Sequence, residues 1–161
     1  MFDKIQIVFL VIVIPLGIAY WLMNTNNISI SEIFYPGTPI MHVGDIPIRV
    51  RIANTEAERT AGLSGKKGFE KNIGGLLFVF EKPEYHGIWM KNMNFPIDII
   101  WINEELTVVG VERNVLPETY PKTFRPKEPV LYVLETETAY ADLVGINVGD
   151  TVKLPKGYLE D

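Results

Sequence analysis

The feature that most constrains this chain is an apolar run near its N-terminus. Residues 5–23, IQIVFLVIVIPLGIAYWLM, are interrupted only by Gln6. At about 1.5 Å of rise per helical residue the run spans roughly 28 Å, which is close to the hydrocarbon thickness of a bilayer. A helix that is apolar on every side has no polar face to turn toward water, so a buried core helix does not explain the run. The run therefore predicts a single transmembrane helix.

The residues at the end of this run favour a retained anchor over a cleaved signal peptide. Cleavage requires small residues at the −3 and −1 positions, but Ala19 lies inside the run and is followed by the bulky Tyr20 and Trp21. Tyr and Trp are typical of the membrane interface, where their rings lie at the level of the headgroups. The chain contains no Cys, which excludes a lipidated cysteine and any disulfide.

The charges around the run predict its orientation. Lys4 and the α-amine precede it, and no further Lys or Arg follows until Arg49. Because Lys and Arg near the span set its orientation, we expect the N-terminus in the cytoplasm and the rest of the chain on the extracytoplasmic side of the cell membrane. The polar residues 24–37 then form a tether, and residues 38–158 form one globular domain with a single core.

The periodicity of this domain predicts a mainly β fold. Residues 46–53, IPIRVRIA, alternate apolar residues with Arg49 and Arg51, as in a strand with one buried face. Further strands are expected at 75–80, 97–102, 106–111, 130–134 and 151–154. Residues 55–58, TEAE, form a capping box that opens a short helix, and residues 138–144 predict a second one. Residues 114–129 contain four prolines and predict a long irregular loop. The expected fold is a β-rich α+β domain with a small barrel or strongly curved sheet and one or two short helices.

A resemblance to a known family comes from five blocks in a fixed order. Residues 86–102, HGIWMKNMNFPIDIIWI, resemble the central signature of the domain-of-unknown-function 192 family, in which a Trp-Met-Lys-Asn core leads to a Pro and an Asp before an apolar strand. The other blocks are at 58–64, 75–80, 132–135 and 148–150, so that the resemblance spans residues 45–154. It implies a compact β-rich domain that is often exported or membrane-anchored, and it implies no established reaction.

Asp98 is the first candidate site residue. Strand alternation places it on one face with Ile100 and Ile102. A carboxylate in apolar company must find a charge partner or several hydrogen bonds, or its pKa rises. A structural interpretation predicts a buried ion pair with Arg59, or hydrogen bonds from backbone N–H groups of residues 89–92. A functional interpretation makes Asp98 an acid/base group or a ligand-binding residue.

The residues just before Asp98 are the second candidate site. They combine an aromatic surface with polar donors ahead of a fixed turn, which suits a groove that stacks a sugar ring or grips an extended peptide. The candidate ligand-binding residues are Trp89, Met90, Lys91, Asn92 and Asn94. In the alternative interpretation, Trp89 and Met90 fill the core while the two Asn side chains organise the turn.

No metal ion or other cofactor is expected. His86 and the nearby methionines could in principle suit Cu(I), but the chain has no Cys, and Met90 and Met93 cannot share a face of an extended segment. Nucleic acid is not expected as a partner either, because the net charge is −5 and no basic stripe is present.

These observations predict a membrane-anchored extracytoplasmic domain that binds a ligand, a glycan or an extended polypeptide at the cell envelope. The membrane itself is the expected partner of residues 5–23. One alternative is a hydrolase-type enzyme that uses Asp98 and Glu135 as two carboxylates, and it is the less favoured class. Another is a structural or assembly partner, which an apolar surface patch without a pocket would favour. A cavity shared by Trp89, Asp98 and Glu135 would separate the three.

Overall fold

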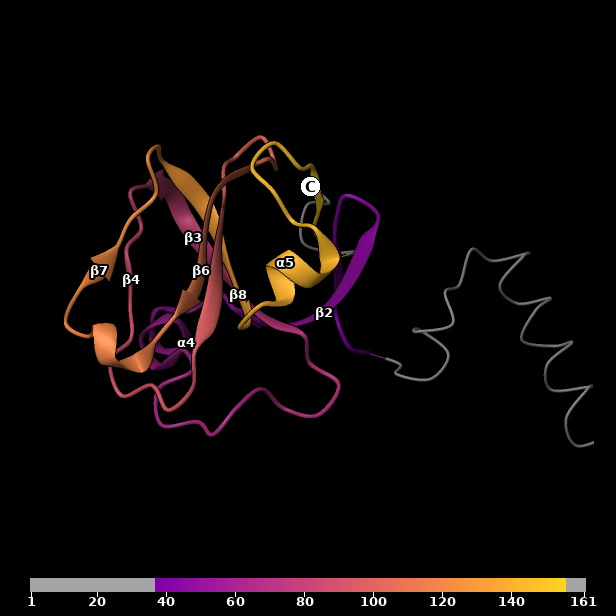
Figure 1. Cartoon of the computed structure of the whole chain (residues 1–161). Coiled ribbons are helices and arrows are strands. Elements are labelled where there is room, and N and C mark those ends of the chain that lie inside the picture. Colours follow the sequence, from indigo (N-terminus) through magenta and orange to yellow (C-terminus); the bar gives the residue numbers. More distant parts are fainter. Residues whose placement is uncertain (1–36, 156–161) are drawn as a thin grey trace, which may run out of the picture. The chain divides into compact units, whose positions relative to one another are not determined.

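The structure is a computed structural model that describes residues 37–155 (Figure 1). The apolar run 5–23 and nearly all of the expected tether 24–37 lie outside the described residues, as do residues 156–161. Within the described part of the chain, no helix is long and apolar enough to cross a membrane.

Most of the described strands belong to one curled sheet. Its strand order is β6-β5-β8-β3-β2-β1-β9. The bounds are β1 Ile40–Val43, β2 Ile46–Ala53, β3 Gly75–Glu84, β5 Ile97–Ile102, β6 Val108–Val115, β8 Val130–Glu137 and β9 Val152–Lys153. Neighbouring strands are antiparallel except for β2 and β3, which are parallel. The expected mainly β fold with a strongly curved sheet is confirmed.

The curl brings the two outer strands of this sheet together at one end and gives it the shape of a half barrel. The Val108 amide donates a hydrogen bond to the Asp150 carbonyl at 2.9 Å, and the Val152 amide donates to the Leu106 carbonyl at 2.7 Å. The strands β4 Ile88–Trp89 and β7 Thr123–Phe124 form a separate two-stranded antiparallel ribbon (Figure 1).

Two short helices and one 3-10 turn complete the described part of the chain. They are α4 Glu56–Ala61, η2 Pro117–Thr119 and α5 Tyr140–Val144. Helix α4 begins at the predicted capping box, where the Thr55 side chain accepts a hydrogen bond from the Glu58 amide and the Glu58 carboxylate accepts one from the Thr55 amide. A parallel pair of strands needs a crossover connection, and α4 lies in the one between β2 and β3.

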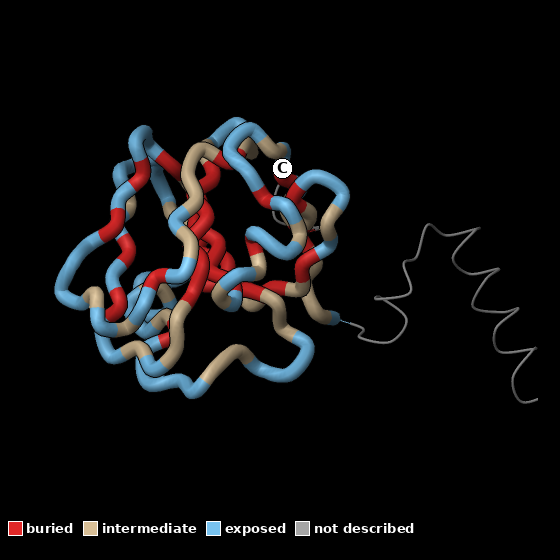
Figure 2. The backbone as a smooth tube through the Cα atoms, in the orientation of Figure 1, coloured by how far each residue is buried: buried red, intermediate tan, exposed pale blue. Residues whose placement is uncertain are grey.

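Both faces of the sheet are covered, so that the buried residues in the middle of the domain form two hydrophobic clusters (Figure 2). The α5-side core contains Ile100, Ile102, Leu134 and Ala141 of α5. The α4-side core contains Ile97, Ile99, Trp101 and Leu76, together with Leu63 from the loop after α4. Successive residues of β5 thus point to opposite cores, as the alternation of its side chains predicts.

Candidate functional site

The surroundings of Asp98 support a structural role for its side chain. It lies on β5, it is fully buried, and it shares the α5-side face with Ile100 and Ile102. Its Oδ1 accepts hydrogen bonds from the backbone N–H groups of Asn114 at 2.8 Å and Ala139 at 3.3 Å, and its Oδ2 accepts one from Ala141 at 2.9 Å. Several backbone donors satisfy a buried carboxylate without a counter-ion. Asp98 therefore ties the end of β6 and the start of α5 to β5.

The predicted ion pair between Arg59 and Asp98 is wrong. Arg59 Nη1 donates hydrogen bonds to the backbone carbonyls of Asn54 at 2.7 Å and Val79 at 2.9 Å. Its Nη2 lies 3.9 Å from the Glu81 carboxylate. Arg59 belongs to the α4 side of the sheet, whereas the Asp98 carboxylate faces the α5 side, so the sheet itself separates the two charges. The backbone donors predicted at residues 89–92 are likewise replaced by donors at residues 114, 139 and 141.

The predicted ligand-binding segment is split between core and surface. Trp89 is 51% exposed, whereas Met90 is buried in the α4-side core. Asn94 donates a side-chain hydrogen bond to the Lys66 carbonyl at 2.8 Å, and the carbonyl of Asn92 accepts one from the Gly65 amide at 2.8 Å. The exposed Lys91 ammonium lies 5.3 Å from the centroid of the Trp89 ring. Asn92 and Asn94 therefore fix the turn and the loop beside it, whereas Trp89 and the neighbouring Met93 line a hollow.

That hollow is a cavity of about 130 Å³ between α4 and the β4–β7 ribbon. One wall is residues 59–64, which comprise the end of α4 and the loop after it. Residues 87–89 at β4, Met93, and Phe78 and Phe80 of β3 also line the cavity. Glu135 of β8 also lines the cavity and is its one acidic lining residue. A mainly apolar cavity with a few polar groups is the usual form of a ligand site.

Glu135 is the residue of this cavity with the most unusual environment. It is 5% exposed, and its Oε2 is fully buried and accepts no hydrogen bond from any described residue. Burial raises the pKa of the Glu135 carboxyl to about 8, and the positive charge of Arg51 offsets this only in part. At neutral pH the carboxyl is therefore mostly protonated and can donate a hydrogen bond as well as accept one.

Strand register explains why Asp98 and Glu135 do not form a pair. Glu135 lies opposite Ile99 of β5 and opposite Leu76 of β3, whereas Asp98 lies opposite Thr136. Residues directly opposite in a sheet point to the same face. Glu135 therefore faces the α4 side and Asp98 faces the α5 side. The cavity contains Trp89 and Glu135 without Asp98, so the predicted two-carboxylate arrangement is wrong.

Comparison with known protein families shows to which family the chain belongs. The model of DUF192, described as "Uncharacterized ACR, COG1430", matches residues 40–154. The chain belongs to the DUF192 family. This confirms the resemblance seen in the sequence, and the matched range includes every residue that lines the cavity. No curated protein matches the chain.

Two solved structures resemble this DUF192 domain. A protein of unknown function from Novosphingobium aromaticivorans DSM 12444 is 28% identical, with a TM-score of 0.65 over 71% of this chain and 83% of that one. A protein from Sinorhizobium meliloti 1021, described as a "putative transcription regulator", is 24% identical, with a TM-score of 0.66 over 73% of this chain and 92% of that one. Because the second structure is only 24% identical, its similarity supports the fold alone.

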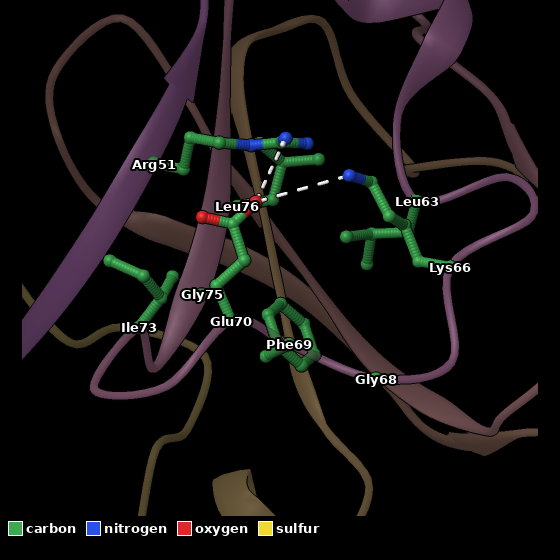
Figure 3. A pocket seen from close by; sticks show the side chains of 9 residues that line it. All are labelled: Arg51, Leu63, Lys66, Gly68, Phe69, Glu70, Ile73, Gly75 and Leu76. Atoms are coloured by element: carbon green, nitrogen blue, oxygen red, sulfur yellow. Dashed lines mark ion pairs between the residues drawn. The ribbon is translucent and has the colours of Figure 1, made fainter.

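A second, smaller hollow of the DUF192 domain supports the cavity wall (Figure 3). Its volume is about 10 Å³, which is room for roughly one water molecule. Glu70 lies between two cations there, 3.6 Å from Arg51 and 3.9 Å from Lys66. Arg51 also donates a hydrogen bond to the Gly62 carbonyl at 3.1 Å. These contacts fix the loop after α4, and Leu63 of that loop lines both hollows.

The aromatic rings at the larger cavity are already engaged by neighbours. The Phe80 ring stacks on His86 with centroids 3.5 Å apart, and the Arg59 guanidinium lies 5.5 Å from its centroid. Trp89 meets Tyr120 edge to face at 5.9 Å. Within residues 37–155, no group of three or more His, Cys, Asp or Glu side chains is placed to hold a metal ion. The chemistry of the cavity is therefore that of Arg59, two hydroxyl side chains and the Glu135 carboxyl.

Part of this site was predictable from the sequence. Trp89 was predicted as a ligand-binding residue, and Glu135 was predicted only as a second carboxylate beside Asp98. Arg59 was predicted on the wrong face of the sheet. The signal that marks Glu135 is an acidic residue inside the apolar segment Val130–Glu137, where alternation places it on one face with Val133.

Proposed function

We propose that this DUF192 domain is a binding module for an extended polypeptide, and that the cavity beside Glu135 receives one group of that ligand. The observation that carries the proposal is the edge of β4. This strand lines the cavity, and within the described part of the chain it pairs only with β7. An unpaired strand edge is a ready template for an added strand.

The register of the ribbon supplies the backbone groups for such an addition. Ile88 lies opposite Phe124, and Trp89 lies opposite Thr123 in the antiparallel pair. In antiparallel pairs, residues alternate between directing their N–H and C=O groups to the partner strand and directing them away. One of Ile88 and Trp89 therefore directs its backbone groups away from β7, toward the edge where a ligand strand can pair.

The loop after α4 limits how long the added strand can be. Ser64 Oγ donates a hydrogen bond to the Lys91 carbonyl at 2.9 Å, and the Gly65 amide donates to the Asn92 carbonyl at 2.8 Å. The backbone just beyond Trp89 is thus already occupied. At about 3.3 Å per residue, the free edge suits two or three ligand residues. A short paired segment needs a further anchor, and the cavity offers one.

The cell envelope is part of this proposal. Its support is the apolar run 5–23 together with Lys4 ahead of it, which favour a domain held outside the membrane by an N-terminal anchor. A polypeptide exposed at the envelope, outside the cytoplasm, is accordingly the expected ligand.

A second candidate function is an enzyme that uses Glu135. Burial raises the pKa of the Glu135 carboxyl to about 8, and a carboxyl that titrates near the working pH suits general acid or base catalysis. Against it, the residues lining the cavity supply no second carboxylate, and the Ser64 hydroxyl donates to the Lys91 carbonyl. Binding without chemistry is therefore the function that the geometry favours.

Selection from a pool of N-acetylated random hexapeptides with free C-termini tests the proposal on the full-length protein. A selected peptide is then resynthesised with N-methyl groups at alternate residues. Because alternate residues of an added strand direct their N–H groups to β4, methylation of one set should abolish binding, while methylation of the other set should change the Kd by less than about twofold.

Two variants localise the binding. Trp89→Ala should weaken it, because Trp89 lines the cavity. The matched control is Tyr85→Ala, since Tyr85 is a similarly exposed aromatic residue that does not line the cavity. Equal effects of the two methylation sets would overturn the proposal. So would binding of chito- or cello-oligosaccharides in place of peptides, or an unchanged Kd in Trp89→Ala.

A further inference from the structure

Arg59 lines the cavity with hydrogen-bond donors to spare. Its Nη1 donates to the carbonyls of Asn54 and Val79. Its Nη2 lies 3.9 Å from Glu81, which is beyond hydrogen-bond distance, and the Glu81 side chain is 85% exposed. No described residue accepts a hydrogen bond from Nε or Nη2 of Arg59. The Nε and Nη2 groups lie on one edge of the guanidinium, and such an edge pairs with a carboxylate through two parallel hydrogen bonds.

The other polar groups of the cavity are complementary to an acceptor. Glu135 carries a buried Oε2 without a hydrogen-bond partner. Glu135 lines the cavity, and burial raises the pKa of its carboxyl to about 8, so at neutral pH the carboxyl carries an O–H donor. A ligand that brings oxygen acceptors satisfies both Arg59 and Glu135.

A cationic ligand suits the cavity poorly. It would lie beside the Arg59 guanidinium, which is also placed over the Phe80 ring at 5.5 Å. A second ring of the cavity wall, Trp89, already has the Lys91 ammonium at 5.3 Å from its centroid. Like charges at these positions oppose a third cation, and the rings of Phe80 and Trp89 are already in cation–π contact.

We propose that the polypeptide ligand places a carboxylate in this cavity, where the Nε–Nη2 edge of Arg59 holds it and the Glu135 carboxyl donates a further hydrogen bond to the ligand. This inference rests on the proposed binding of an extended polypeptide. The carboxylate has two sources with the same chemistry, the C-terminus of the ligand and an Asp or Glu side chain.

The arrangement makes binding depend on pH in a defined direction. The charged group that acts on the Glu135 carboxyl is Arg51 from β2, and Arg59 from α4 lines the same cavity, while β3, β4 and β5 present the uncharged Leu76, Ile88 and Ile99. An ionised Glu135 would repel the ligand carboxylate, so the protonated form is the one that binds. Affinity should therefore be about tenfold lower at pH 9 than at pH 7, because most of the carboxyl is ionised at pH 9.

The test uses the selected hexapeptide and the full-length protein, with the Kd measured by fluorescence anisotropy at pH 6.5. The peptide is prepared as the free acid, as the C-terminal amide, and with each acidic side chain replaced in turn by its amide. One of these replacements should weaken binding by about tenfold or more, and which one does so identifies the source of the carboxylate.

Two protein variants assign the contacts. Arg59→Lys keeps the charge but loses the paired donors, and it should weaken the free-acid peptide about tenfold while leaving the peptide that lacks the critical carboxylate unaffected. The matched control is Arg125→Lys, since Arg125 is exposed, bonds to the Tyr85 carbonyl at 2.9 Å and does not line the cavity. Glu135→Gln keeps a donor but cannot ionise, so its Kd should be the same at pH 7 and pH 9.

Several results would overturn the inference. If every amide peptide binds as well as the free acid while the alternate methylation pattern holds, the carboxylate contact is refuted and the binding of an extended polypeptide stands. If no hexapeptide binds, both the carboxylate contact and the proposed binding of an extended polypeptide are refuted. Tighter binding at pH 9 than at pH 7 would mean that the ligand brings a cation to an ionised Glu135, which also refutes the inference.

Discussion

Replacing Glu135 by glutamine should change how stability depends on pH. Burial raises the pKa of this carboxyl from 4.5 to about 8 in the folded protein. Between these values the folded state holds a proton that the unfolded state has lost, so the free energy of unfolding falls as the pH rises. At 1.36 kcal/mol per pH unit the loss is about 3 kcal/mol by pH 7, and it approaches an upper limit of about 5 kcal/mol above pH 8. Glu135→Gln has no proton to lose and should escape this loss.

Urea unfolding of the full-length protein at pH 5, 6, 7 and 8 measures the effect. The difference in free energy of unfolding between Glu135→Gln and the wild type should grow in favour of the variant by a few kcal/mol across this range. The matched control is Glu137→Gln, which alters an exposed carboxyl on the same strand and should follow the wild-type curve. Parallel curves for Glu135→Gln and the wild type would refute the assignment of a buried, protonated carboxyl.

Three further predictions concern the Asp98 contacts and the membrane. Asp98→Asn should lower the free energy of unfolding by about 2–4 kcal/mol in urea, because an amide has one oxygen to accept the three backbone hydrogen bonds now shared by two. In the double variant with Arg59→Met, the two losses in free energy of unfolding should add, since the two side chains lie on opposite faces of the sheet. A coupling above about 0.5 kcal/mol in the double-mutant cycle would contradict their placement. Mild detergent but not high salt should release the protein from membranes, because the proposed transmembrane anchor of residues 5–23 leaves the bilayer only when detergent disperses the lipid; recovery of a soluble form that begins near residue 24 would count against a retained anchor.

The parts of the fold that local pattern determines were predictable from the sequence. The alternation in IPIRVRIA and the apolar run that contains Asp98 gave β2 and β5 with their observed bounds. The Thr55–Glu58 capping box located the start of α4 because both of its hydrogen bonds join residues three apart. The hairpin of β5 and β6 was also predicted, although β6 begins at Val108, two residues later than expected.

Features that depend on long-range pairing were not predictable in this way. Asp98 is satisfied by backbone N–H groups 16 to 43 residues away, and a backbone donor leaves no mark in the sequence that could compete with a visible cation such as Arg59. The proline-rich residues 114–129 contain β7 because β4 supplies a partner for it. A short strand of this kind exists only through its pairing.

The burial of Glu135 and the walls of its cavity were missed for the same reason. The apolar pattern predicted that the strand beginning at Val130 ends at residue 134, which would have left Glu135 at an exposed end. The strand continues to Glu137 because β3 and β5 pair with it on both sides, and this buries Glu135. The cavity wall then combines α4 and β4, whose positions in the sequence give no indication that they face each other.

The proposed contact between Glu135 and a ligand carboxylate is tested most directly by titration of the Glu135 side-chain carboxyl carbon by ¹³C NMR, with and without the selected hexapeptide. Full-length protein labelled at the glutamate carboxyls is used, and Glu135→Gln assigns the signal. We expect a titration near pH 8 in the free protein and a shift to higher pH with bound peptide, because a ligand carboxylate nearby favours the protonated form. A titration near pH 4.5, or one near pH 8 that saturating peptide does not move, would contradict it.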